Sequence, residues 1–383
     1  MADHLGIERT VGCGTSASFE VTGLRPGMEY RFRLYALTQT KSRELLHEVV
    51  VRLSDIPWSS LWERLQAGSE EAAYSDDFAQ FLGNVLPVCV HRADYPKWFG
   101  LWERNGVHVT PVHFYEHIPD TQTLPDKLWE QPQQLPGVDL NHDRQRHLLC
   151  EDFPVFRQEY QAIPESPTDN EGEFYLDNGR FEGLDPLLAY CMVRHFKPRQ
   201  IVEVGSGFST LILSKAALQN GTTELHSIEP YPEEFLRKGM AGLTSLTIKK
   251  VEDVSLQRFT QLESGDCLFI DSSHVVRIGG DVNYLFLEVL PRLQVGVLVH
   301  VHDIFLPFEY PQDWVLERRR FWTEQYLLQA FLTFNSEFEV LASSGYMNKN
   351  FPGELEVVFP TSAPWGGGSF WMRRKIKDIL PSK

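Results

Sequence analysis

The sequence predicts an α/β fold with a doubly wound, Rossmann-like and mostly parallel sheet of seven strands, preceded by a smaller N-terminal part. Two observations favour this fold. From about residue 174 onward, apolar segments of strand length alternate with amphipathic segments of helix length, which is typical of parallel strands joined by helices. The chain has 383 residues, 42% of them hydrophobic, which is enough for a large core and for two domains.

The elements of this second part are short and regularly spaced. Strands such as "QIVEV" and "DCLFI" are nearly continuous apolar runs, as expected where both faces of a sheet are covered. We expect helices over 185–196, 209–219, 280–293 and 320–334, and strands over 200–205, 224–230, 245–250, 266–271, 295–304, 338–343 and 368–374.

The N-terminal part has a different pattern. Residues 18–52 alternate polar and apolar positions around "LRPGMEY", a Pro-Gly turn followed by a tyrosine. This resembles the second half of a fibronectin type III domain, where a tyrosine corner opens a late strand. We therefore assign residues 1–53 to a small fibronectin type III-like β fragment without chemistry of its own.

Residues 54–165 are predicted to be an α+β extension, and 166–383 the main domain. The extension is rich in Trp, Pro and His, includes a strand-like stretch at 106–119, and ends at the polar loop "IPESPTDNEGE". Residues 106–181 are too apolar for a linker and too rich in Pro and Gly for a core of their own. We expect them to form a cap on the carboxyl edge of the sheet.

Composition excludes several classes of protein. The formal net charge of -16 repels phosphate backbones, so nucleic acid is not an expected partner. No run of 18 apolar residues and no signal-peptide pattern is present, so we expect no membrane span. The five scattered cysteines, never in a CxxC pair, indicate reduced thiols and a cytoplasmic protein.

The loop "VGSGFST", which follows the first strand of the sheet, predicts a ligand site. Gly205 and Gly207 allow a tight turn and a close approach to the backbone, and the first amides of the next helix face the same space. Acids end neighbouring strands: Glu229 is placed to accept ribose hydroxyls. The predicted cofactor-binding residues of these strand ends are Glu203 (for an amino group), Gly205, Ser206, Gly207, Ser209, Thr210, Glu229, Glu252 and Asp253 (for an adenine), and Asp271.

These strand ends, "EVGSGFST", "SIEP", "FIDSSH" and "HVHDI", resemble those of class I S-adenosylmethionine-dependent methyltransferases. The resemblance covers about residues 106–375 and is closest to bacterial enzymes similar to the catechol, cephamycin and macrolide-sugar O-methyltransferases. It implies S-adenosyl-L-methionine as the cofactor and an antiparallel last strand, "GSFWMRR". It also implies that "FYLDNGRF" folds over the cofactor, with contacts from Tyr175, Asn178 and Phe181.

In the same families, the positions of Asp271, His302 and Asp303 carry ligands of a divalent metal ion. The resemblance therefore implies a metal site that takes Mg²⁺ or Mn²⁺. The imidazole of His302 makes the site softer than the all-oxygen set of those families, and a site without metal stays open as well.

Methyl transfer to a hydroxyl needs a base, a metal, or both, because an alcohol is a poor nucleophile at neutral pH. We expect the catalytic residues to be Asp271, with His274 as the first choice of base and His302 as the second if no metal binds. His300 shares a strand face with His302 but lies deeper, and we expect it to be structural.

Two alternative functions remain open. A nicotinamide-dependent oxidoreductase would share the glycine loop and the acid after the second strand, but position 210 is Thr where a dinucleotide fingerprint has its third glycine. A non-catalytic binding or scaffolding protein would have no need of an intact cofactor loop. The expected acceptor is the hydroxyl of a small molecule, a sugar or a glycan, and a homo-oligomer stays open.

Overall fold

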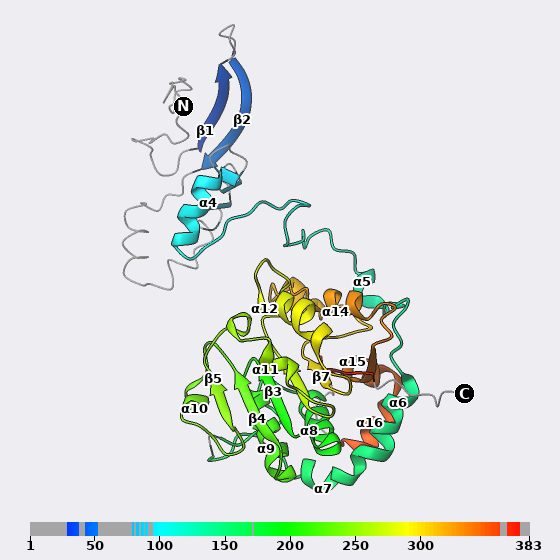
Figure 1. Ribbon diagram of the computed structural model, residues 1–383. Coiled ribbons are helices and arrows are strands. Elements are labelled where there is room, and N and C mark those ends of the chain that lie inside the picture. Colours follow the sequence, from blue (N-terminus) through cyan, green and yellow to red (C-terminus); the bar gives the residue numbers. More distant parts are fainter. Residues whose placement is uncertain are drawn as a thin grey trace, which may run out of the picture. The chain divides into compact units, whose positions relative to one another are not determined.

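A computed structural model gives the fold of the protein (Figure 1). It describes residues 29–37, 43–52, 95–170, 172–360 and 366–375, with helical positions 79, 82–83, 86–87 and 89–90. The chain divides into two compact units, Met1–Asp120 and Thr121–Lys383.

The first unit includes a two-stranded antiparallel hairpin of β1 (Glu29–Leu37) and β2 (Arg43–Arg52), as the β pattern of this region predicts. The Pro-Gly turn of the proposed fibronectin-like fragment lies outside the described residues, as does the boundary after residue 53. Helix α4 (Tyr95–Arg104) follows. Residues 107–118 form irregular backbone followed by turns and bends instead of the expected strand. No strand in the described part of the first unit pairs with them, and Phe114 and Tyr115 are exposed.

The second unit is built on a seven-stranded sheet in the order β5-β4-β3-β6-β7-β9-β8. The predicted seven-stranded α/β sheet is thus confirmed. Strands β5, β4, β3, β6 and β7 pair in parallel, and β9 runs antiparallel to both of its neighbours. The strand bounds are β3 Gln200–Val204, β4 Glu224–Ile228, β5 Ser245–Thr247, β6 Cys267–Ile270, β7 Leu298–Val301, β8 Phe338–Ser343 and β9 Phe370–Arg374.

Helices cover both faces of this sheet (Figure 1). Alternate strand residues face opposite sides and join two separate cores. Ile201 and Phe269 pack with α8 (Asp185–Phe196) and α9 (Phe208–Asn220), whereas Val202 and Ile270 pack in the core that Leu328 of α14 (Glu324–Leu332) joins. This arrangement explains why the strands are apolar at nearly every position.

The remaining helices are short. The segment predicted as one helix over 280–293 changes from α to π to 3-10 geometry before Leu293, with Pro291 in its last turn. The predicted helix over 320–334 begins only at Glu324. The other bounds are α5 Lys127–Glu130, α6 His142–His147, η1 Leu148–Asp152, η2 Phe153–Phe156, α7 Arg157–Tyr160, α10 Glu234–Arg237, η3 Val251–Asp253, α11 Gln257–Thr260, α12 Asp281–Asn283, η4 Tyr284–Val289, η5 Leu290–Arg292, α13 Gln312–Leu316, α15 Ser344–Asn350 and α16 Pro352–Val358.

The segment before residue 165 differs from the predicted separate cap. Phe153 and Tyr160 are buried in the same core as α8, their rings lie 6.3 and 5.0 Å from that of Phe359, and Tyr160 donates to the carbonyl of Val358. Residues 142–160 are therefore part of the second unit, and no division of the structure falls at 165/166.

The loop at 175–184 reaches the carboxyl ends of the strands, where Phe181 contacts His302. An earlier segment contacts the loop after β7: Trp129 Nε1 donates to the carbonyl of Tyr310, and the amide of Gln133 to that of Pro307.

Strand β3 lies between β4 and β6, so the order of strands reverses there, and the carboxyl ends of β3, β4, β6 and β7 adjoin each other. Crevices at such a reversal are the usual ligand sites of open α/β sheets. Among the residues that the structure describes, no helix combines the length and the apolar character needed to cross a membrane.

Candidate active site

The loop after β3 is held in place by the buried carboxylate of Glu203. This side chain accepts hydrogen bonds from Ser209 Oγ at 2.9 Å, Thr210 Oγ1 at 2.8 Å and Ser227 Oγ at 2.5 Å. Burial raises the pKa of Glu203 to about 7, although the three hydroxyls lower it. Together with Ser227 of β4, the residues Glu203, Ser209 and Thr210 thus link β3, α9 and β4. Their contact with a cofactor stays a prediction.

Two glycines shape this loop in different ways. Gly205 has φ +80°, and a Cβ on it would lie 1.7 Å from the carbonyl oxygen of Asp271, so only glycine lets the loop touch the end of β6. A Cβ on Gly207 would meet no atom within 4 Å. Thr210, which replaces the third glycine of a dinucleotide fingerprint, accepts a hydrogen bond from the Gly207 amide at 3.1 Å and caps α9.

Glu229 follows β4 directly and lies beside the same loop. Its carboxylate accepts the Ser206 amide at 3.2 Å and the Tyr231 amide at 2.7 Å, and it is partly exposed. The Oγ atom of Ser206 is buried without a hydrogen-bond partner among the described residues. Glu252 and Asp253 lie in the 3-10 turn after β5, with Glu252 half-buried and Asp253 exposed. The structure thus brings the predicted strand-end acids to one edge of the sheet.

The loop at 175–181 is organised around Asn178. Its Oδ1 accepts the amides of Arg180 and Phe181, and its Nδ2 donates to the carbonyls of Tyr175 and Phe181, all at 2.8–2.9 Å. The Tyr175 ring meets the Phe208 ring edge to face at 5.8 Å, at the start of α9. Because the amide of Asn178 is used within the loop, the residue positions Tyr175 and Phe181. A direct cofactor contact by Asn178 stays a prediction.

Four side chains from the ends of β6 and β7 converge: Asp271, His274, His302 and Asp303 offer ligand atoms that all lie within 4.8 Å of one another. Nδ1 of His302 lies 3.2 Å from Asp271 Oδ1 and 3.5 Å from Asp303 Oδ2. Nε2 of His274 lies 3.4 Å from each of the same two oxygens. The four atoms therefore alternate nitrogen and oxygen around a closed ring. We call these four residues the His–Asp cluster.

Two further carboxylates hold the outer nitrogens of these histidines. His302 Nε2 lies 3.2 Å from Asp185 Oδ2, and His274 Nδ1 lies 2.9 Å from Glu324 Oε2. Asp185 and Glu324 are 3% and 0% exposed. Neither residue belongs to a motif of the sequence. Each is the first residue of a helix, where an acid is commonplace because of the helix dipole, so the sequence has no signal that singles them out.

The backbone of the His–Asp cluster adopts an unusual conformation at two positions. His274 has φ 60° and Asp303 φ 55°, in the left-handed region that non-glycine residues seldom adopt. Such residues cost roughly 1–3 kcal/mol each and tend to occur at functional sites. The carbonyl of His274 accepts the amides of Thr323 and Glu324, and a Cβ on Gly368 would lie 2.7 Å from Asp303 Cα. These contacts hold both residues in place.

The electrostatics of the His–Asp cluster favour cations, because four carboxylates surround two imidazoles. Burial lowers the pKa of His274, but Asp271 and Glu324 outweigh it and raise this pKa to about 10. Burial opposes charge on His302 too, yet Asp303 and Asp271 hold its pKa well above the ordinary value. Burial raises the pKa of Asp271, but His302 and His274 reverse this and hold it low. Neither histidine has a ring nitrogen that faces away from carboxylates.

The His–Asp cluster is accessible mainly through Asp271, whose side chain is 25% exposed, against 7–11% for the other three. The Phe181 ring lies 4.9 Å from that of His302, and the half-buried Trp322 ring lies 4.4 Å from that of His274. The main chain of Asp271 is also where Gly205 makes its close approach. The cluster is thus flanked by Phe181 and Trp322, and its most exposed member adjoins the glycine loop.

His300 has the structural role that the sequence predicts. It is fully buried on β7, its ring stacks on Phe269 at 3.8 Å, and Nε2 lies 2.9 Å from Ser369 Oγ. Burial, followed by the nearby charge of His302, lowers its pKa well below the ordinary value. It therefore packs as a neutral core residue beneath the His–Asp cluster.

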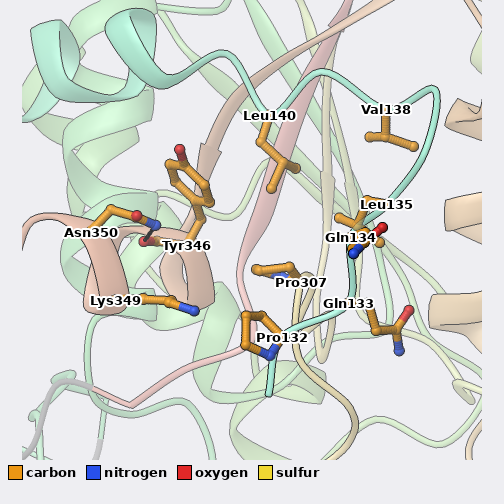
Figure 2. A pocket seen from close by; sticks show the side chains of 10 residues that line it. All are labelled: Pro132, Gln133, Gln134, Leu135, Val138, Leu140, Pro307, Tyr346, Lys349 and Asn350. Atoms are coloured by element: carbon orange, nitrogen blue, oxygen red, sulfur yellow. Dashed lines mark hydrogen bonds between the residues drawn. The ribbon is translucent and has the colours of Figure 1, made fainter.

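A separate surface pocket of about 270 Å³ lies elsewhere on the second unit (Figure 2). It is bounded by residues 132–140, Pro307 and three side chains of α15, Tyr346, Lys349 and Asn350. None of its lining residues belongs to the glycine loop or to the His–Asp cluster. This pocket is therefore not part of the candidate active site.

Residues 202–304 match a family model described as a methyltransferase domain. The match begins within β3 and ends just after Asp303, so it includes both the glycine loop and the His–Asp cluster. The part of the second unit that holds both features is therefore similar to a methyltransferase domain.

An uncharacterized protein from Archaeoglobus fulgidus is 35% identical to this chain over 164 residues, which cover 40% of the chain and 73% of the relative. The chain belongs to the same family as this archaeal protein. Among solved structures, an O-methyltransferase from Bacillus cereus in complex with SAH matches 58% of this chain and 89% of its own, at 13% identity and a TM-score of 0.29. A similarity this low has no bearing on activity.

Proposed function

We propose that the protein is an S-adenosylmethionine-dependent methyltransferase that methylates a hydroxyl group of a small molecule, a sugar or a glycan. One geometric observation supports this proposal in addition to the family match. The glycine loop, where the methyl donor would bind, touches the His–Asp cluster through Gly205 and the Asp271 carbonyl. A donor in the loop and an acceptor at the cluster would thus be adjacent.

The residues around the loop suit the parts of this cofactor. Glu229 is partly exposed and can accept ribose hydroxyls with the lone pairs that the two backbone amides leave. The open space above Gly207 and the first amides of α9 suit the aminoacyl part. Glu252 and Asp253 lie where the adenine would bind, and Tyr175 lies over the start of α9.

Methyl transfer from a sulfonium is an in-line displacement. The acceptor oxygen forms a bond to the methyl carbon while the carbon–sulfur bond breaks, which leaves a methyl ether, S-adenosylhomocysteine and one proton. The proton passes to water, because the raised pKa values of His274 and His302 leave neither imidazole free to accept it. In the His–Asp cluster, Asp271, His302 and Asp303 would hold a divalent cation, which would lower the pKa of the hydroxyl.

The acceptor would enter beside Trp322. This half-buried ring lies against His274 at 4.4 Å, and the guanidinium of Arg320 lies over it at 5.1 Å. An acceptor there would meet an aromatic ring and a cation beside the His–Asp cluster.

A calorimetric titration of the full chain with S-adenosylmethionine tests the cofactor. Glu229→Ala should weaken binding by roughly 1–3 kcal/mol, the usual loss when a hydrogen-bonded charge is removed. Glu224→Ala, an exposed acid at the opposite end of the same strand, is the matched control and should bind as the wild type does. Transfer of a labelled methyl group to a panel of hydroxyl compounds then identifies the acceptor. Binding of NADH in place of S-adenosylmethionine would overturn the proposal.

A further inference from the structure

We infer that Asp271, His274, His302 and Asp303 together bind one divalent ion of a first-row transition metal in preference to Mg²⁺, and that Asp185 and Glu324 orient the two histidine ligands. The inference deepens the proposed function and relies on it only for the role of the site in catalysis. It makes His274 a ligand instead of a free base. Metal binding is measurable without any methyl transfer.

The spacing of the four donor atoms supports a common ion. Donor atoms at the corners of a tetrahedron, each about 2.1 Å from a central ion, lie about 3.4 Å apart. In the His–Asp cluster, the four nitrogen–oxygen separations are 3.2, 3.4, 3.4 and 3.5 Å. The remaining nitrogen–nitrogen and oxygen–oxygen separations stay within 4.8 Å. The ring is therefore of a size at which one ion at its centre would contact all four donor atoms.

The orientation of the two imidazoles supports the same conclusion. Metal-bound histidines nearly always donate their second ring N–H to a carboxylate or carbonyl, which fixes the tautomer. Asp185 receives the outer nitrogen of His302 in this way, and Glu324 that of His274. Asp185 is itself fixed by the amides of Gly368 and Ser369. Each histidine therefore has one nitrogen directed to the ring and one to a buried carboxylate.

The two carboxylates that contact the outer histidine nitrogens belong to separate helices. Asp185 begins α8 and Glu324 begins α14, and these helices lie in the two different cores of the sheet. A buried carboxylate is expected to have a partner, because burial of an unpaired charge is costly. Glu324 Oε1 has no hydrogen-bond partner among the described residues. Orientation of a histidine ligand from each side accounts for both acids.

The donor set decides the kind of metal. Mg²⁺ prefers oxygen ligands in an octahedral arrangement and retains several waters. Two imidazoles and two carboxylates suit Mn²⁺, Fe²⁺, Co²⁺ or Zn²⁺ better, since imidazole is a ligand of transition metals. The replacement of oxygen donors by His274 and His302 thus changes the selectivity of the site.

The first experiment uses the full chain after removal of metal with a chelator. Zn²⁺, Mn²⁺ and Mg²⁺ are titrated separately by calorimetry, and the bound metal is counted by mass spectrometry. We expect one Zn²⁺ or Mn²⁺ per chain, with an affinity at least 100-fold above that for Mg²⁺. Binding of Mg²⁺ as tight as that of both other ions, or no binding of any of the three, would overturn the inference.

Variants then test the ligands and their supports. His274→Ala should abolish binding of Zn²⁺, whereas Asp185→Asn and Glu324→Gln should weaken it about 10- to 100-fold. His300→Gln is the matched control on the same strand as His302, and it should retain the wild-type affinity provided that circular dichroism shows it folded. Full affinity in His274→Ala would remove it from the ligand set.

Cobalt substitution keeps the test independent of variants that fail to fold. The visible spectrum of Co²⁺ bound to the wild-type chain reports nitrogen ligands and a low coordination number, and we expect both. A spectrum of fully hydrated, all-oxygen Co²⁺ would contradict the inference. If the chain bound S-adenosylmethionine but no metal, this inference would be wrong and the proposed function would still stand.

Discussion

Nε2 of His302 lies 3.2 Å from Oδ2 of Asp185, although 117 positions separate the two residues in the chain. Asp185 begins α8, and His302 directly follows β7. The same carboxylate accepts the amides of Gly368 and Ser369 before β9, and the hydroxyl of Ser344 in α15. One buried side chain thus joins four distant segments at the candidate active site.

The first prediction concerns the hydrogen bonds of Asp185. Asp185→Ala leaves two buried amides and the imidazole of His302 without their acceptor, and should lower the free energy of unfolding by roughly 2–4 kcal/mol. Chemical denaturation measures this difference. Asp177→Ala, at an exposed acid of the nearby loop, should unfold as the wild type does. Equal midpoints for the two variants would mean that Asp185 does not stabilise the fold.

The second prediction concerns the contact between the glycine loop and the His–Asp cluster. Gly205→Ala places a Cβ 1.7 Å from the Asp271 carbonyl oxygen at a φ of +80°, so the loop has to move. We expect a loss of at least about 2 kcal/mol in the free energy of unfolding, since the left-handed conformation alone costs alanine roughly 1–2 kcal/mol. The measurement is denaturant unfolding monitored by tryptophan fluorescence.

The control for this substitution is Gly353→Ala in α16. A Cβ there meets nothing within 4 Å, and alanine favours a helix, so stability should change by less than about 1 kcal/mol. If Gly205→Ala is equally harmless, the close approach between β3 and β6 is not as described.

A third prediction follows from Glu203. Its pKa in the fold is about 7, raised by burial above the ordinary 4.5, so the folded state holds this proton more tightly than the unfolded chain does. Its contribution to stability is therefore fully present below about pH 4.5 and is lost as the pH rises to about 7. Glu203→Gln cannot ionise and should escape this loss, which amounts to roughly 3 kcal/mol.

Unfolding free energies of wild type and Glu203→Gln at pH 4.5 and pH 8 test this sign. Between pH 4.5 and pH 8, the free energy of unfolding of Glu203→Gln should rise relative to that of the wild type. Glu356→Gln, at an exposed carboxylate in α16, serves as the control and should follow the wild-type profile. A difference that stays constant with pH would contradict the buried ionisation of Glu203.

The sequence predicted the strands of the sheet and the acids that follow them because both leave local signals. Apolar runs mark β3, β6 and β7. Glu229 follows β4, Asp271 follows β6, and the His302–Asp303 pair follows β7. Since parallel strands end at one edge, their convergence follows from the fold alone.

Other features could not be predicted because they depend on tertiary contacts. The direction of the His274 ring results from a left-handed backbone and from Glu324, 50 positions away. Residues 107–118 alternate like a strand but have no strand beside them in the described part of the first unit. The core shared by Phe153 and α8 likewise has no local signature.

A fourth prediction separates the two units by truncation. Removal of residues 1–120 should leave a folded, cooperatively melting domain, because that boundary lies between the compact units. Removal of residues 1–165 should destroy it, since Leu148, Phe153 and Tyr160 are then missing from the core. Calorimetric melting distinguishes the two fragments. A stable fold after the longer deletion would show that residues 142–160 are a separable cap after all.

The central claim, that a methyl donor and its acceptor meet between the glycine loop and the His–Asp cluster, is tested most directly by a crystal structure with S-adenosylhomocysteine. The account predicts ribose hydroxyls within hydrogen-bond distance of Glu229, the aminoacyl part beside Gly205 and Gly207, and the sulfur facing Asp271 across an empty acceptor space. A ligand bound elsewhere, or one whose sulfur faces away from the cluster, would contradict it.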